Sequence, residues 1–164
     1  MTEKLWLDLS TQYYTILSRS YKWMQNPISR TRARDHGYRL EDHVIELDAG
    51  RETGKSIALE LFLNLVIPET TMIRYYGHSG NSASEMKRLI GANRGTFYAS
   101  RTFLNQNHDT VFRGISKDKP VVFVFEECGL SKQDIVKQIN KLTYGAYELN
   151  RKYTVLPVII KIGM

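Results

Sequence analysis

A short apolar run, a glycine-containing loop and a Lys-Ser pair follow one another in residues 44–56, and few folds accommodate that arrangement. The segment reads Val44-Ile45-Glu46-Leu47-Asp48-Ala49-Gly50-Arg51-Glu52-Thr53-Gly54-Lys55-Ser56. The apolar run predicts a buried strand and the residues after Ser56 predict a helix, so the glycines fall in a tight loop between the two. Such a loop directs successive backbone N–H groups toward an anion at the amino end of the helix. The segment therefore predicts an α/β fold with a phosphate-binding loop.

The loop differs from the strict pattern G-x-x-x-x-G-K-[ST] at its first position, where Ala49 stands and Gly50 follows. We expect Lys55 to reach the β and γ oxygens of a nucleotide and the Ser56 hydroxyl to bind Mg²⁺. The residues expected to bind the nucleotide are Gly50, Arg51, Glu52, Thr53, Gly54, Lys55 and Ser56. The alternative is an ordinary strand-to-helix turn with a solvated lysine.

A second apolar run, Pro120-Val121-Val122-Phe123-Val124-Phe125-Glu126-Glu127-Cys128, ends in two acids. It fits a central parallel strand that is buried on both faces. At its carboxyl end we expect Glu126 to coordinate Mg²⁺ and Glu127 to deprotonate an attacking water. This is a Walker B pattern with Glu in the usual Asp position. Two acids alone would more often be a solvated strand end, but the glycine loop makes the catalytic interpretation the preferred one.

Length and composition favour one soluble domain. With 164 residues, of which 42% are hydrophobic, the chain can bury a substantial core. No apolar run is long enough to span a bilayer, and the first residues lack the apolar region of a secretory signal. We therefore expect no membrane and a cytoplasmic location.

The cysteine and histidine residues do not predict a metal site. Cys128 is the single cysteine, which excludes an internal disulfide and a cysteine-cluster zinc site. We expect it to be a small packing residue rather than a nucleophile. The four histidines show no metal-ligand spacing. The only metal expected is nucleotide-bound Mg²⁺, held by Ser56 and Glu126.

The net charge of +6 permits contact with nucleic acid. Two stretches are rich in arginine. The first contains Arg30, Arg32, Arg34 and Arg39, and the second interleaves Arg94, Arg101 and Arg113 with Phe97, Tyr98 and Phe103. Interleaved cations and aromatic rings could hold a nucleic-acid backbone by charge and base stacking. A solvated surface with core aromatics is the alternative for either stretch.

The sequence also predicts the order of helices and strands. An N-terminal helix over 5–24 would place Leu7, Tyr14, Leu17 and Tyr21 on one face. Besides the strand before Glu126, strands are predicted at 43–47, 71–76, 111–115 and 153–162, and helices at 55–66, 82–90 and 131–149. The helix over 82–90 is predicted to begin with a capping box from Ser82 to Glu85, and 91–95 to be a loop.

These elements predict an α/β, three-layer P-loop NTPase fold with a mainly parallel central sheet. The long stretch between Lys55 and Glu126 suits the ASCE class, in which another strand lies between the two motif strands. Residues 1–40 would form a helical segment packed on a P-loop core of 41–164, in a single domain overall. The chain stops at Met164, where such ATPases usually continue. We therefore expect a truncated C-terminal edge: a missing strand, an edge covered by the N-terminal segment, or a fragment of something larger.

The two motifs resemble those of viral DNA-packaging ATPases, the large terminase subunits of tailed bacteriophages. Residues 49–56 resemble their deviant Walker A, in which an arginine commonly follows the glycine, and Val124-Phe125-Glu126-Glu127-Cys128 resembles their Walker B. Over residues 40–164 the resemblance implies ATP hydrolysis coupled to moving double-stranded DNA into a procapsid. It implies an oligomer or larger packaging assembly, in the host cytoplasm if the protein is viral.

The same resemblance implies roles for single residues. Lys55 and Ser56 would bind phosphate and Mg²⁺, Glu126 would coordinate the metal and Glu127 would be the catalytic base. Arg51 would sense or stabilise the γ-phosphate. An arginine finger from a neighbouring subunit would come from Arg74, Arg94, Arg101 or Arg113, and Gln25 would read adenine.

The chain departs from that family in one respect. A complete large terminase also carries a C-terminal nuclease domain, for which this chain leaves no room, and no later acidic cluster could bind two metal ions. We therefore expect a Mg²⁺-dependent ATPase without nuclease activity. Two alternatives stay open: a nucleotide-binding regulator or assembly module with little turnover, and a small P-loop kinase, which Glu127 disfavours.

Overall fold

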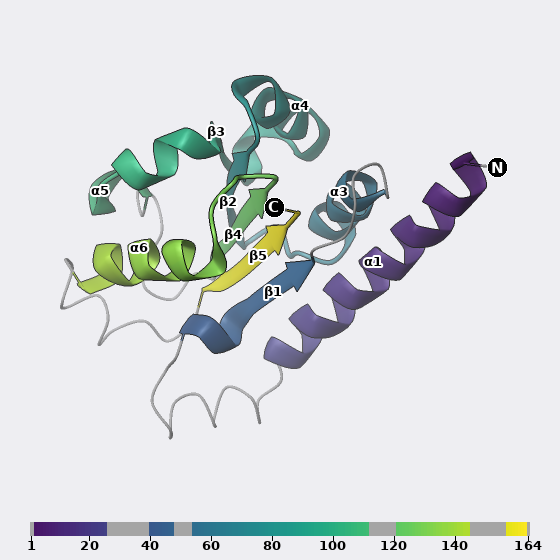
Figure 1. The fold of residues 1–164 in the computed structure, drawn as a ribbon, viewed down its shortest axis with the longest axis horizontal. Helices are drawn as coiled ribbons and strands as arrows, with labels where there is room; N and C mark the ends of the chain where they lie inside the picture. The colour runs from purple at the N-terminus through teal and green to yellow at the C-terminus, as the bar shows by residue number, and fades with distance from the viewer. Residues whose placement is uncertain (1, 26–39, 48–53, 112–120, 145–156, 164) are drawn as a thin grey trace.

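The computed structural model describes residues 2–25, 40–47, 54–111, 121–144 and 157–163, and Figure 1 shows its fold. The α-helices are α1 (Thr2–Met24), α3 (Lys55–Leu65), α4 (Gly80–Ile90), α5 (His108–Val111) and α6 (Lys132–Tyr144). The strands are β1 (Val44–Leu47), β2 (Met72–Gly77), β3 (Gly95–Ala99), β4 (Val121–Glu126) and β5 (Val158–Ile162), and the 3-10 helices are η1 (Leu40–His43), η2 (Ala92–Arg94) and η3 (Ser100–Asn105). None of the helices in these ranges is both long and apolar enough to cross a membrane.

The five strands form one sheet in the order β1-β5-β4-β2-β3, and every pair is parallel. The expected parallel α/β sheet is therefore confirmed. As expected, another strand, β5, lies between the two motif strands β1 and β4. The register places Leu47 and Glu126 on either side of Ile162, so the carboxyl ends of these three strands are aligned.

The position of β5 corrects the expectation of a truncated C-terminal edge. The last strand pairs on both sides, and among the described strands the edges are β1 and β3. The mainly apolar sequences of β4 and β5 agree with this central position, because a strand covered by helices on both faces is rich in apolar residues.

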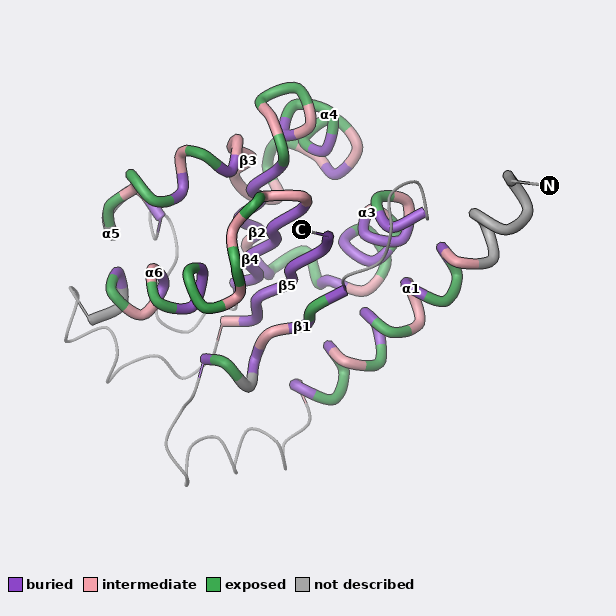
Figure 2. The backbone as a smooth tube through the Cα atoms, in the orientation of Figure 1, coloured by how far each residue is buried: buried purple, intermediate pink, exposed green. Residues whose placement is uncertain are grey.

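Helices cover both faces of the sheet (Figure 1). On one face α1, α3 and α4 pack against alternate strand residues, and the core there includes Leu17, Tyr21, Leu59, Phe62, Val124, Ile160 and Ile162. On the other face α6 and η3 pack against the intervening residues, and the core there includes Phe103, Phe123, Phe125, Ile135, Ile139 and Ile159. Figure 2 shows the buried positions concentrated in the strands and on the inward sides of the helices.

The N-terminal helix is confirmed as α1. Leu17 and Tyr21 are buried and Tyr14 is partly buried against the same core, as the periodicity predicts. Tyr21 contacts Phe62 of α3 edge to face, with ring centroids 5.7 Å apart. The helix therefore lies on the same face of the sheet as α3, which carries Lys55.

The start of α4 differs from the prediction. Ser79, not Ser82, is the N-cap: its backbone is extended and its Oγ accepts from the Ser82 N–H at 3.2 Å. Both serines are good capping residues, and the helix begins at Gly80, two residues before the predicted start at Ser82. The predicted capping box at Ser82 is therefore wrong by one helical turn.

The strand β3 lies partly where the sequence predicts a loop. The predicted loop covers 91–95, but Gly95 begins a strand that pairs with β2 opposite Ile73. A Cβ on Gly95 would overlap the main chain of Ile73, so only glycine allows this close approach. The β-prone residues Thr96, Phe97 and Tyr98 were the available signal.

Other predicted bounds fall partly outside the described residues. Val111, where a strand over 111–115 was predicted, is the last residue of the helix α5, and 112–115 lie outside the described residues. The helix predicted over 131–149 is described only as far as residue 144, and the strand predicted over 153–162 only from residue 157.

Candidate active site

The N-cap and the first turn of α3 position Lys55, the positively charged residue of the site. Gly54, the N-cap of α3, has φ +85, a left-handed conformation that glycine adopts without strain. The Oγ of Ser10, from α1, donates to the Gly54 carbonyl at 3.1 Å. The loop therefore enters α3 with its last residue held by the N-terminal helix, and Lys55 and Ser56 follow at once.

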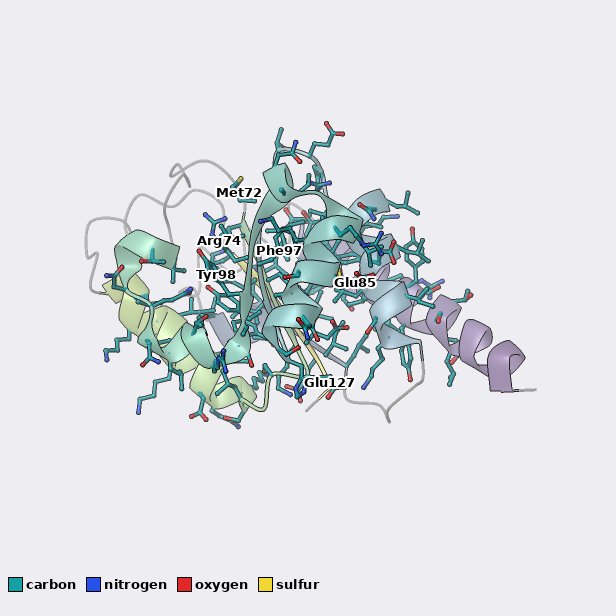
Figure 3. The ribbon with its side chains drawn as sticks, turned by 90° about the horizontal axis from the view of Figure 1, so that it is seen from above. Met72, Arg74, Glu85, Phe97, Tyr98 and Glu127 are labelled. Carbon is teal, nitrogen blue, oxygen red and sulfur yellow. The ribbon has the colours of Figure 1, made fainter. Side chains whose placement is uncertain are left out.

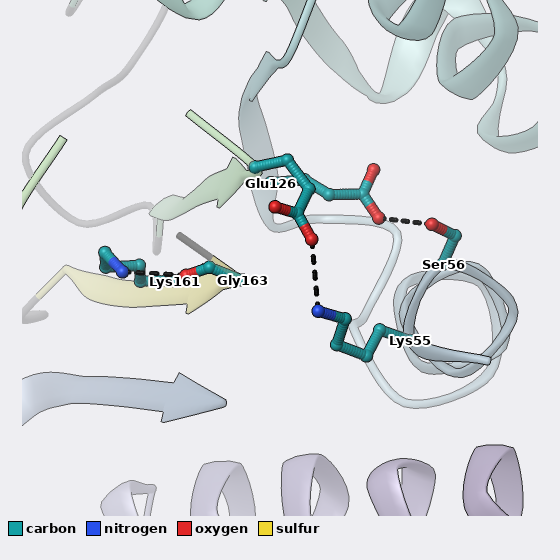
Figure 4. Close-up of polar contacts among 6 residues, drawn as sticks. Lys55, Ser56, Glu126, Lys161 and Gly163 are labelled. Atoms are coloured by element: carbon teal, nitrogen blue, oxygen red, sulfur yellow. Dashed lines mark hydrogen bonds and ion pairs between the residues drawn. The ribbon is translucent and has the colours of Figure 1, made fainter. Parts of the chain in front are cut away.

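Ser56 and Glu126 meet at the carboxyl end of β4 (Figure 4). The Ser56 Oγ donates to Glu126 Oε2 at 2.7 Å. The other carboxylate oxygen, Oε1, accepts a short hydrogen bond from the Tyr75 hydroxyl of β2. The Glu126 side chain, on a buried residue, is therefore held at both oxygens.

Lys55 and Glu127 form an ion pair. The Lys55 Nζ lies 3.0 Å from Glu127 Oε1, and the exposed fractions of the two side chains are 7% and 36%. Glu127 has φ +48, which is uncommon for a residue with a side chain, and its N–H donates to the Ile162 carbonyl of β5 at 2.8 Å. This turn at the end of β4 directs the Glu127 carboxylate toward Lys55.

Gly163, directly after β5, lies next to the Glu127 carboxylate. Its N–H donates to the Leu47 carbonyl at 2.8 Å, which ties β5 to the end of β1. A Cβ on Gly163 would overlap the Glu127 carboxylate, and φ +75 is itself a glycine conformation. The carbonyl of Gly163 accepts from the Nζ of buried Lys161 at 2.8 Å (Figure 4). Glu127 can therefore occupy its position because residue 163 has no side chain.

The donor atoms suit a nucleotide-bound magnesium ion. Mg²⁺ prefers oxygen ligands and usually takes only one or two protein carboxylates, completing its shell with phosphate oxygens and water. A hydroxyl and a carboxylate, from Ser56 and Glu126, meet at 2.7 Å. Within the described ranges no group of three or more His, Cys, Asp or Glu side chains could hold a metal ion. A cation between Ser56 and Glu126 would therefore depend on phosphate for most of its ligands.

Four of the predicted site residues come together: Lys55, Ser56, Glu126 and Glu127. Gly54 lies directly before them. Gly50, Arg51, Glu52 and Thr53 lie outside the described residues.

Three contributors, Ser10, Tyr75 and Gly163, were not predicted from the sequence. The available signals were a tyrosine in β2, which the sequence does not distinguish from the adjacent Tyr76, and a glycine directly after β5. Cys128 is a half-buried packing residue, as expected, and burial raises the pKa of its thiol, which disfavours the thiolate.

The base-reading role considered for Gln25 does not fit. Ser10 of α1 contacts Gly54, the residue directly before α3. Gln25 follows the last turn of the same helix, about 22 Å further along its axis at 1.5 Å per residue. It lies toward the opposite end of α1 from the candidate site (Figure 1).

Arg74 and Arg94, two of the four arginine-finger candidates, donate to main-chain carbonyls. Arg74 is 1% exposed and its Nε donates to the Val111 carbonyl at 2.9 Å, so it is not positioned to reach a neighbouring subunit. It pairs with Phe123, early in β4, and Figure 3 shows it well separated from Glu127. The side chain of Arg94 donates to the carbonyls of Ile67 and Pro68, each at 3.2 Å.

Of the four finger candidates, Arg101 is exposed and Arg113 lies outside the described residues. The first stretch, from Arg30 to Arg39, also lies outside them.

The aromatic residues of the second stretch pack on other rings. Phe97 lies against Tyr75 with centroids 5.9 Å apart, and Tyr98 stacks on Tyr76 at 5.9 Å. Phe103 is fully buried against Phe125. The core interpretation of these rings is therefore favoured over base stacking.

The described site thus combines a lysine and a hydroxyl at the start of a helix with two carboxylates at the end of a neighbouring strand. These four side chains come from the start of α3 and the carboxyl end of β4, and they are supported by Gly163 after β5, Tyr75 of β2 and Ser10 of α1. No family model matches this chain, and neither a curated protein sequence nor a solved structure matches it. The assignment of a function therefore rests on the geometry of this site and on the resemblance of its two motifs.

Proposed function

We propose that this chain binds ATP with Mg²⁺ and hydrolyses it, as a P-loop ATPase of the ASCE class related to viral DNA-packaging motors. One observation carries the proposal: Lys55 and Ser56 from the start of α3 contact Glu127 and Glu126 from the end of β4. ATP hydrolysis needs these groups together, namely a phosphate-binding cation, two oxygen ligands for the metal and a carboxylate base.

Lys55 and Ser56 would bind the phosphates and the metal. The Lys55 ammonium lies at the amino end of α3, where the helix dipole and the first backbone N–H groups also favour an anion. Ser56 and Glu126 would hold Mg²⁺, which supplies charge neutralisation on the phosphate oxygens when it is bound. Arg51, from the loop before α3, would contact the γ-phosphate.

Glu127 is the group that can accept a proton from water. Its side chain is 36% exposed, so water can reach the carboxylate. Lys55, which contacts Glu127 Oε1 at 3.0 Å, is also the residue expected to contact the γ-phosphate. A single lysine therefore keeps the base close to the phosphate that water attacks.

Double-stranded DNA is the proposed polymer partner. The resemblance to large terminase subunits and the net charge of +6 support it. A homo-oligomer or larger packaging-type assembly is proposed on the same resemblance, with exposed Arg101 as the described candidate for an arginine finger.

The test is phosphate release from ATP in the presence of Mg²⁺, with and without double-stranded DNA. We expect hydrolysis that requires Mg²⁺ and rises when DNA is added. Tight ATP binding without turnover would instead support a nucleotide-binding regulator or assembly module. Phosphate transfer to a nucleoside or metabolite would support a small kinase, and the absence of any nucleotide binding would contradict the proposed function.

Gly163→Ala is expected to lower kcat for ATP hydrolysis about 10- to 100-fold, since a misplaced catalytic group has effects of this size. The new methyl group would displace the Glu127 carboxylate. Gly129→Ala is the matched control, because Gly129 has φ +71 but an added Cβ would meet nothing within 4 Å. Both variants carry similar backbone strain, so their difference in kcat reports the collision with Glu127. Equal kcat values would contradict the catalytic position assigned to Glu127.

A further inference from the structure

Tyr75 reaches the candidate metal site from a strand that carries neither motif. It is fully buried in the middle of β2, and its hydroxyl donates to Glu126 Oε1. Tyr75 pairs with Val124, two residues before Glu126. Its ring must therefore extend along the sheet toward the carboxyl ends of the strands to reach the carboxylate.

Gly77 provides the space for that orientation. It lies two residues after Tyr75 and hence on the same face of β2. A Cβ on Gly77 would lie 2.8 Å from Tyr75 Cε1 and 3.0 Å from its hydroxyl oxygen. Both distances are shorter than ordinary van der Waals contacts, so any larger residue at position 77 would move the ring. Phe97 of β3 contacts the ring at 5.9 Å between centroids.

Glu126 has a particular need for such support. It stands where the Walker B pattern more often has Asp, and a glutamate has one more rotatable bond over which its carboxylate must be ordered. Ser56 binds Oε2 at 2.7 Å, and Tyr75 binds Oε1. The two donors come from different elements, α3 and β2, and together they set the orientation of the carboxylate.

We propose that Tyr75 is a positioning residue for the metal-binding carboxylate: its hydroxyl holds Glu126 Oε1 so that Oε2 faces Ser56, and Gly77 leaves room for its ring. The inference rests on the proposed Mg²⁺-ATP function. On this proposal, part of the affinity for Mg²⁺ comes from the Tyr75 hydroxyl, which does not itself contact the metal. The proposal also gives a reason for a glycine two residues after Tyr75 on the same face of β2.

A tyrosine hydroxyl is a hydrogen-bond donor at neutral pH, so the Tyr75 hydroxyl can donate to Glu126 Oε1.

The experiment compares Tyr75→Phe with Tyr76→Phe in the full chain. Tyr76 is the adjacent residue, is equally buried, and loses one hydrogen bond, from its hydroxyl to the neutral amide oxygen Oε1 of Gln106 at 2.7 Å, on the opposite face of β2. The readouts are the Mg²⁺ concentration that gives half-maximal ATP hydrolysis, ATP binding measured in EDTA, and thermal stability. The first reports the metal site, while the other two report nucleotide contacts and folding.

We expect Tyr75→Phe to raise the half-maximal Mg²⁺ concentration about tenfold or more, because a hydrogen bond to a charged group contributes an effect of this size. ATP binding in EDTA should be unchanged. Tyr76→Phe should lose similar stability without a change in Mg²⁺ dependence. The same Mg²⁺ dependence in both variants would overturn the positioning role.

Gly77→Ala provides an independent variant should Tyr75→Phe fold poorly. It keeps the hydroxyl but displaces the ring, so it should also raise the Mg²⁺ concentration that gives half-maximal ATP hydrolysis. Gly80→Ala should leave that concentration unchanged, because a Cβ on Gly80 would meet nothing within 4 Å. Normal Mg²⁺ dependence in Gly77→Ala would count against the inference. If the parent protein hydrolyses ATP and the variants behave alike, only the inference fails. If the parent binds no Mg²⁺-ATP at all, the proposed function fails and the inference is overturned with it.

Discussion

Glu127→Gln should lower kcat for ATP hydrolysis about 10²- to 10⁴-fold, the contribution typical of a general base. Glutamine keeps the size and the hydrogen-bonding shape of the side chain but cannot accept a proton from water. The substitution also removes a negative charge 3.0 Å from the Lys55 Nζ. ATP should therefore bind at least as tightly as in the parent, because the lysine no longer pairs with a carboxylate that competes with phosphate.

The measurement is single-turnover hydrolysis of Mg²⁺-ATP together with equilibrium binding of the nucleotide. Glu69→Gln is the control, since Glu69 is exposed in the loop before β2, at the amino ends of the strands. It should behave as the parent does in both measurements. Parental kcat in Glu127→Gln would rule out Glu127 as the base, while loss of binding alone would assign it a structural role.

Lys55→Ala should weaken ATP binding and lower kcat/KM about 10²- to 10³-fold, as removal of one charged donor from a preorganised site does. Its ammonium is nearly buried at the start of α3 and contacts Glu127. Removing it takes away the cation expected at the β and γ phosphates and leaves Glu127 without that ion pair. Unlike Glu127→Gln, this variant should lose both nucleotide binding and turnover.

Nucleotide binding by titration and hydrolysis under saturating ATP separate those two effects. Lys87→Ala is a suitable control because it removes the same charge from an exposed position on α4. It corrects for any general effect of lowering the positive charge of the chain on DNA-stimulated turnover. Parental binding and turnover in Lys55→Ala would exclude the phosphate-binding role of the loop.

The sequence allowed the main elements of the site to be predicted because their signals are local. The apolar run before the loop predicts β1, the residues after Gly54 predict α3, and the run ending at Glu126 predicts β4. Each pattern depends on residues that are close in the chain. The nearness of Glu126 to Ser56 also followed, because the carboxyl ends of parallel strands meet at one edge of a sheet, whereas the Lys55–Glu127 ion pair was not predicted.

Sequence patterns predicted the structure wrongly where two residues could serve the same role, or where a residue is required by a contact with a part of the chain that is distant in sequence. Ser79 and Ser82 can both cap a helix, and the sequence pattern favoured the wrong one. β3 was missed because its first residue is a glycine, which normally indicates a loop. At Gly95 the glycine is required instead by the main chain of Ile73, on a different strand.

The sequence by itself determined the α/β class, the parallel sheet and the four side chains that form the candidate site. Only the tertiary structure decided that the strand between β1 and β4 is β5, the last strand of the chain, and that β2 lies beside β4. Those two neighbours bring Gly163 against Glu127 and Tyr75 against Glu126. The physical reason is that strand order depends on how the whole set of apolar faces is buried together, and that is a property of the complete sheet rather than of any one segment.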